Sequence, residues 1–87
     1  MKAHQISIEI PESVLEATNT DAIAFVQEMR VLAAVKLYEM ARLSSGKAAE
    51  LAGMSRVEFL LNLDKYQVFP FGQELQELEA ERASSNQ

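Results

Sequence analysis

The stretch from Leu43 to Leu60, LSSGKAAELAGMSRVEFL, most constrains how this chain can fold. Its apolar residues follow helical spacing on both sides of Gly53. Because glycine tolerates the positive φ with which many helices end, Gly53 predicts a sharp turn. Ala49, four positions earlier, is small enough to let a second helix cross close to the first. The stretch therefore predicts two short helices, Ser45–Ala52 and Arg56–Tyr66, joined by a tight turn.

The second of these helices begins with a recognisable cap. In a capping box the serine hydroxyl accepts a hydrogen bond from the glutamate N–H, and the glutamate carboxylate accepts one from the serine N–H. Ser55 and Glu58 have this spacing. Met54 and Phe59 are expected to be buried where the two helices meet. These features together are typical of a helix-turn-helix, a motif that many proteins use to bind DNA.

The N-terminal residues have a different periodicity. Gln5–Ile10 alternates polar and isoleucine residues, which predicts a half-buried strand with its isoleucines on one face. Pro11 ends this strand and favours a short helix over Glu12–Ala17. A strand needs a hydrogen-bonding partner. The candidates are Gln67–Phe71 of the same chain and the same strand of a second subunit, and the sequence leaves both open.

A long central helix is expected over Asp21–Arg42, because Thr18–Asp21 is rich in N-cap residues. Beside its main apolar face, Phe25, Met29 and Leu32 form a second apolar strip. A helix that is apolar on more than one side is central in its fold or lies in an oligomer interface. Since a chain of 87 residues has little else to cover this strip, we expect a homodimer with these three residues in its interface.

Arg30 falls inside the main apolar face of the long helix. Either its stem packs while its guanidinium reaches water, or it forms an ion pair across the core or the dimer interface. Glu50 and Glu58 are the candidate partners for such a pair.

The predicted fold class is mainly α, with a short N-terminal strand, a long central helix, a helix-turn-helix, a short C-terminal strand and an acidic tail. We predict one domain over residues 1–72 and a weakly ordered tail over residues 73–87. Residues 67–87 hold one basic and four acidic side chains. Such a segment can fold on a partner, or it can be a solvated helix that maintains solubility. The apolar residues available to a partner are Phe69, Phe71, Leu75 and Leu78.

The charge distribution bears on DNA binding. A net charge of −5 argues against a general nucleic-acid binder. Residues 44–66, however, hold three basic and three acidic side chains, so the acidity lies outside the two-helix stretch. The candidate DNA-contacting residues are Lys47, Ser55, Arg56 and Lys65. Because Asp64 would repel phosphate, a helical hairpin that only builds the fold remains the alternative.

Other classes of site have little support in the sequence. The chain has no cysteine and one histidine, which excludes disulfides and the usual zinc sites. No spacing singles out a catalytic pair, so we expect a protein that is not an enzyme and has no cofactor or small-molecule substrate. The first residues do not resemble a signal peptide, and no apolar run is long enough to cross a membrane. We therefore expect a cytoplasmic protein.

The Leu43–Leu60 block, the Ala34–Glu39 segment AVKLYE and the Ile-Pro end of the first strand together resemble the small prokaryotic uncharacterised protein family 0175. The resemblance covers residues 6–70. It implies an antitoxin-like homodimer whose helix-turn-helix binds operator DNA at its own promoter. It also implies a C-terminal segment that covers a PIN-domain ribonuclease toxin. The alternative is a protein–protein interaction module with a degenerate helix-turn-helix that binds no DNA.

Overall fold

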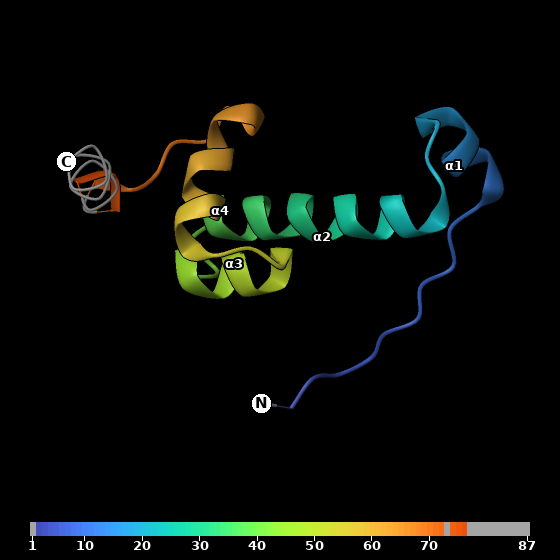
Figure 1. Cartoon of the computed structure of the whole chain (residues 1–87), viewed down its shortest axis with the longest axis horizontal. Coiled ribbons are helices and arrows are strands. Elements are labelled where there is room, and N and C mark those ends of the chain that lie inside the picture. Colours follow the sequence, from blue (N-terminus) through green and yellow to red (C-terminus); the bar gives the residue numbers. More distant parts are fainter. Residues whose placement is uncertain (1, 73, 77–87) are drawn as a thin grey trace.

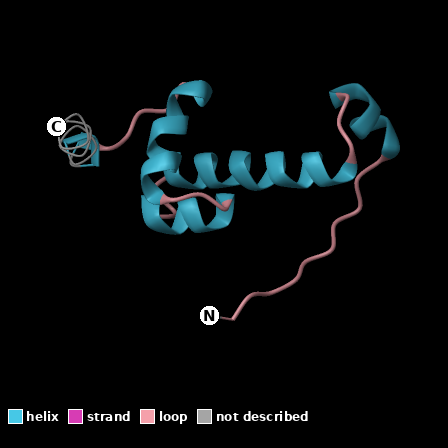
Figure 2. Cartoon of the chain, viewed as in Figure 1, coloured by secondary structure: helices cyan, strands magenta, loops and turns pink. Residues whose placement is uncertain are grey.

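The chain is mainly helical, as predicted (Figures 1 and 2). The computed structural model describes residues 2–72 and 74–76, and none of these forms a β-strand. The helices are α1 (Glu12–Thr18), α2 (Ala22–Glu39), α3 (Ser45–Ala52) and α4 (Arg56–Asn62), and the 3-10 helix η1 (Leu63–Tyr66) follows α4. No helix within the described residues is both long enough and apolar enough to cross a lipid bilayer.

The central helix α2 begins where the sequence predicted and ends earlier. Asp21 is its N-cap, and the Asp21 side chain accepts a hydrogen bond of 2.8 Å from the Ala24 N–H. The helix was expected to reach Arg42. It ends at Glu39 because Ala41 adopts a left-handed conformation with φ of 60°. This reversal turns the chain back, so that α3 packs against the second half of α2.

The two-helix segment formed by α3 and α4 follows its predicted local chemistry. Gly53 ends α3 with a φ of 73°. Both bonds of the capping box are present at the start of α4: the Glu58 N–H donates to Ser55 Oγ at 3.1 Å, and the Ser55 N–H donates to Glu58 Oε1 at 3.2 Å. The predicted single helix to Tyr66 ends at Asn62 and continues as η1.

The core lies entirely in the second half of α2 and the elements that follow it. In Figure 1, α4 runs across α2 and α3, and the small side chains of α3 permit this close approach. Tyr38 and Phe59 meet edge to face with ring centroids 5.6 Å apart. Met54, which we expected to be buried, is half-buried against this core. The buried apolar residues are Val31, Ala34, Val35, Tyr38, Ala48, Ala49, Ala52, Phe59, Leu60, Leu63 and Val68.

Side chains of α2 also hold the carboxyl end of α3. Gln27 Nε2 donates to the Ala52 carbonyl at 3.0 Å, and Arg30 Nε donates to the Leu51 carbonyl at 2.8 Å. The last carbonyls of a helix lack partners within it and carry partial negative charge, so they attract cationic donors. Arg30 therefore bonds to backbone in place of an ion pair across the core, and the described ion pairs include none between Arg30 and either glutamate. An ion pair across a dimer interface stays a prediction.

Neither predicted strand forms within this chain. Residues 2–10, which we call the N-terminal arm, are extended and lack backbone partners among the described residues. The other candidate strand, Gln67–Phe71, cannot pair with the arm, because Val68 is buried against the core and its N–H donates to the Leu63 carbonyl. The arm leaves from α1, at the opposite end of α2 from α4 (Figure 1).

This separation makes the molecule elongated. The Cα radius of gyration is 15.1 Å, whereas a compact chain of this length has about 12 Å. α1 has no buried residue. Of the predicted acidic tail, residues 74–76 are helical, and residues 77–87, including Leu78, lie outside the described part of the chain.

Candidate functional site

The first turns of α3 and α4 carry three of the four residues predicted to contact DNA. Lys47 is exposed on α3, where its ammonium lies 3.2 Å from the Glu50 carboxylate. Exposed pairs of this kind contribute little and exchange readily with other partners. Ser55 is the N-cap of α4, so its hydroxyl oxygen already accepts a backbone hydrogen bond. The fourth residue, Lys65, is exposed on η1.

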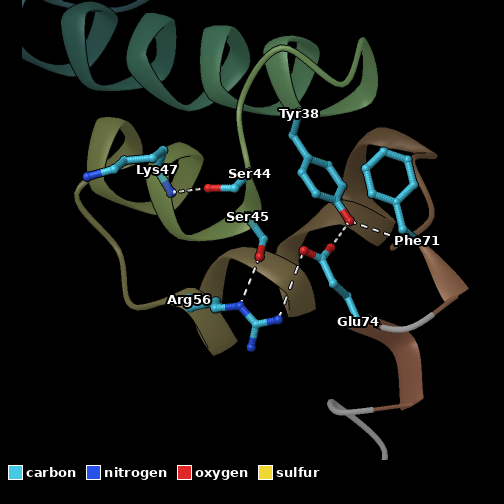
Figure 3. Close-up of polar contacts among 7 residues, drawn as sticks. All are labelled: Tyr38, Ser44, Ser45, Lys47, Arg56, Phe71 and Glu74. Carbon is cyan, nitrogen blue, oxygen red and sulfur yellow. Dashed lines mark hydrogen bonds and ion pairs between the residues drawn. The ribbon is translucent and has the colours of Figure 1, made fainter.

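Arg56 is the most constrained of the four predicted residues. Its Nε donates to Ser45 Oγ at 2.9 Å, and its Nη2 lies 4.0 Å from Glu74 Oε1 (Figure 3). Ser45 is 2% exposed, so this bond joins the first turn of α4 to the buried first turn of α3. The Arg56 side chain nevertheless retains 39% of its exposure, which leaves part of the guanidinium in contact with solvent.

The contact between Arg56 and Glu74 extends into the core through Tyr38. Figure 3 shows the Tyr38 hydroxyl between the Glu74 carboxylate, to which it donates, and the Phe71 N–H, from which it accepts at 3.0 Å. The rings of Tyr38 and Phe71 also pack, with centroids 4.8 Å apart. We call Ser45, Arg56, Glu74 and Tyr38 the polar cluster. It joins α2, α3 and α4 to the beginning of the C-terminal segment.

Burial within the polar cluster changes the acidity of the tyrosine. The pKa of Tyr38 is raised from 10.0 to about 12, chiefly by desolvation and in addition by the hydrogen bond to Glu74. The Phe71 N–H and the Arg56 charge act against this shift. Tyr38 is therefore a neutral donor at physiological pH, and it holds the Glu74 carboxylate beside Arg56.

Three of the four residues predicted to bind a protein partner are described, and all three are exposed. The exposed fractions are 80% for Phe69, 46% for Phe71 and 41% for Leu75. Phe69 and Leu75 line a depression of about 310 Å³ over η1 and the end of α4, together with Leu60 and Val68. Phe71 instead lies against Tyr38. The structure thus brings Phe69 and Leu75 to one surface.

The predicted interface strip on α2 is only partly accessible. Phe25 and Met29 are half-buried, and Leu32 is 45% exposed. Ile23 and Val26, on the same half of the helix, are more exposed, at 85% and 53%. The exposed apolar surface of α2 is therefore centred closer to the N-terminal arm than the sequence indicated.

Sequence reasoning missed three members of the polar cluster. Tyr38 has the helical spacing of a core residue, Ser45 has no feature that separates it from Ser44, and Glu74 belongs to an acidic run. Tyr38 and Glu74 are 36 positions apart, so no local pattern joins them. The one available signal was the tyrosine itself, because a buried phenol hydroxyl normally requires a hydrogen-bonding partner.

Comparison with known proteins places the sequence in a family. The family model for the uncharacterised protein family UPF0175 matches residues 1–87. The chain belongs to UPF0175. No curated protein and no solved structure matches it. The family assignment agrees with the resemblance carried by the Leu43–Leu60 block.

Proposed function

We propose that this UPF0175 chain is a small regulator of the antitoxin type, which binds DNA through α3 and α4 and a protein partner through its C-terminal segment. The observation that most supports this proposal is the contact between Arg56 and Glu74. Arg56 is the residue best suited to a phosphate or a base edge, and Glu74 belongs to the acidic segment expected to bind the partner. The two proposed sites therefore share one ion pair.

The shared pair suggests how the two functions are coupled. With Glu74 beside Arg56, a phosphate has to compete with a carboxylate for the same guanidinium. A partner that draws the C-terminal segment away, for example onto a basic cleft of a PIN-domain ribonuclease, would leave Arg56 available to DNA. The ion pair itself is 4.0 Å long and its Arg56 side chain is 39% exposed, so it contributes little. The main cost of drawing the segment away is the loss of the contacts that Glu74 and Phe71 make with Tyr38.

Binding to a duplex from the chain's own upstream region tests the DNA function. Fluorescence anisotropy at low salt is the appropriate measurement, because phosphate attraction is then strongest. We expect Lys65→Ala and Arg56→Ala to weaken binding, the latter by about 1–3 kcal/mol if Arg56 contacts a base. Glu74→Gln should strengthen binding, because it removes the competing charge. Lys36→Ala is the matched control, since Lys36 pairs with Glu39 on α2 outside the two-helix segment.

A second candidate function is an interaction module that binds no DNA. It is favoured by the internal engagement of Lys47, Ser55 and Arg56, each of which already has a partner within the chain. Absence of any anisotropy change at low salt would support this module and contradict the first proposal. Co-purification of the chain with a ribonuclease encoded beside it would then test the remaining partner function, with Phe69→Glu as the disrupting variant.

A further inference from the structure

The N-terminal arm has the features of a strand without a partner. It is extended over residues 2–10, and none of its backbone groups is hydrogen-bonded within the described residues. Ile6 is 78% exposed and Ile8 is 63% exposed. A single extended segment is not stable alone in water, because it gains neither ladder hydrogen bonds nor buried area. The arm therefore requires a hydrogen-bonding surface that residues 11–72 and 74–76 do not provide.

Beside the arm lies an apolar groove of about 600 Å³. Its two sides are the arm isoleucines, Ile6, Ile8 and Ile10, and the α2 residues Val26, Met29 and Ala33. The isoleucines thus face the middle of α2, from Val26 to Ala33, across an open space. An occupant of this groove has to be apolar on one face, and it has to offer backbone donors and acceptors to the arm.

We infer that the occupant is the arm of a second copy, paired antiparallel with the first about a twofold axis perpendicular to the resulting two-stranded ribbon. Such an axis maps each face of the ribbon onto itself. Even-numbered residues of one copy must therefore lie opposite even-numbered residues of the other, and odd opposite odd. Because Ile6, Ile8 and Ile10 are all even-numbered, the isoleucines of both copies fall on the same face. That shared apolar face closes the groove of each copy against its α2.

The charges and the end of the arm select the direction and register. A parallel, in-register pair would place the two Glu9 carboxylates side by side, which is unfavourable. Antiparallel pairing with Ser7 opposite Ser7 separates them and sets Ile6 of each copy opposite Ile8 of the other. It also pairs residues 4–10 completely and ends before Pro11, which has no N–H to donate.

The elongated shape of the chain supports a second copy over an unrelated partner. The arm and α1 contribute no buried residue to the core, and Ile23 and Val26 remain exposed beside them. In a dimer paired through the arms, these residues of both copies would form a second apolar core, to which each copy contributes the same side chains. The inference does not rest on the proposed DNA-binding function, and its test uses no DNA.

Size-exclusion chromatography with light scattering on the full chain is the first test. We expect the wild type to have twice the 9.7 kDa mass of one chain at micromolar concentration. Ile8→Glu should weaken dimerisation on the order of 100-fold or more, because it places a charge in each half of the apolar face. Ile8→Val should remain dimeric. Met40→Glu is the matched control, since it adds the same charge at an apolar residue that is 54% exposed and lies at the C-cap of α2, outside the arm.

A cross-link tests the register. Because the chain has no cysteine, Ser7→Cys introduces a single thiol. Residues directly opposite in an antiparallel pair have Cα atoms about 4.5–5.5 Å apart, which is within disulfide range. Mild oxidation should therefore convert the Ser7→Cys protein to a covalent dimer, whereas Lys65→Cys should not form one at a comparable rate. Far-UV circular dichroism confirms that each variant keeps its helices.

A wild-type monomer at micromolar concentration would overturn the inference, as would a dimer that Met40→Glu dissociates and Ile8→Glu leaves intact. A dimer that Ile8→Glu dissociates but Ser7→Cys does not cross-link would overturn the antiparallel register.

Discussion

The two halves of α2 have similar apolar content and different surroundings. Its second half contributes Val31, Ala34, Val35 and Tyr38 to the core, whereas residues 22–30 contribute no buried side chain. The difference arises because the buried contacts of α3 are with the second half, whereas the first half reaches α3 only through the polar side chains of Gln27 and Arg30. Burial along α2 therefore depends on which other elements pack against each part of the helix. The composition of α2 alone does not show which half is buried.

The largest effect should come from the packed region. Phe59→Ala removes a ring that is 1% exposed and lies against Tyr38, so we expect a loss of about 3–5 kcal/mol in the free energy of unfolding. Val14→Ala in α1 is the comparison, because Val14 is 37% exposed. Urea unfolding followed by circular dichroism measures both. Equal losses for the two variants would contradict the contrast between the regions.

The turn between α3 and α4 should be the next most sensitive position. Gly53→Ala forces a side chain into a left-handed conformation, which costs about 1–2 kcal/mol. Gly46→Ala is the control within the same helix. A Cβ at Gly46 meets nothing within 4 Å, so this variant should be neutral or more stable by up to about 1 kcal/mol. Thermal melts of Gly53→Ala and Gly46→Ala measure the two changes in stability. A comparable loss of stability in both variants would contradict the prediction.

The polar cluster should add a pH-dependent contribution. The pKa of Tyr38 is raised to about 12 in the folded chain, so its stabilising effect is complete below about pH 10, the ordinary tyrosine value. It is lost as the pH rises through 12. Tyr66→Phe leaves Tyr38 as the single tyrosine, whose tyrosinate absorbance reports the titration directly. Tyr38→Phe should remove this alkaline dependence and cost about 0.5–1.5 kcal/mol at neutral pH.

The smallest effect is expected on the unpartnered half of α2. Ile23 is 85% exposed, so Ile23→Ala should change the free energy of unfolding by no more than about 0.5 kcal/mol. Unfolding is measured in a chain that also carries Ile8→Glu, because that substitution removes the proposed arm pairing. A larger loss there would mean that the N-terminal region packs within one chain, contrary to the contrast between the two halves.

The features that sequence predicted well are those that depend on near neighbours. The capping box joins Ser55 to Glu58, and the left-handed turn depends on Gly53 itself, so both follow from local chemistry. The end of α2 was misplaced by three residues because Ala41 takes a left-handed conformation that alanine seldom adopts. The turn is closed by hydrogen bonds from the Ala41 and Arg42 N–H groups to the Tyr38 and Leu37 carbonyls, and an alanine in the sequence gives no sign of it.

The features that sequence could not predict join distant positions. Arg30 binds a backbone carbonyl 21 positions away, and every residue offers an identical carbonyl. Tyr38 and Glu74 meet only after the chain has turned three times. For the arm, the alternation of Gln5–Ile10 indicated an extended conformation correctly, but no strand forms there, because the described residues of the chain hold no backbone partner for it.

Under the proposed DNA binding and arm pairing, the length of α2 would set the spacing of paired DNA sites. At 18 residues, the helix is about 27 Å long, and it connects the arm-bearing end to the two-helix segment without interruption. In a twofold dimer joined through the arms, the two copies of α4 would stand at a separation determined by α2. Dimeric helix-turn-helix proteins contact half-sites about 34 Å apart, one turn of DNA. Removing one helical turn from α2 would then change the preferred half-site spacing while leaving every contacting side chain in place.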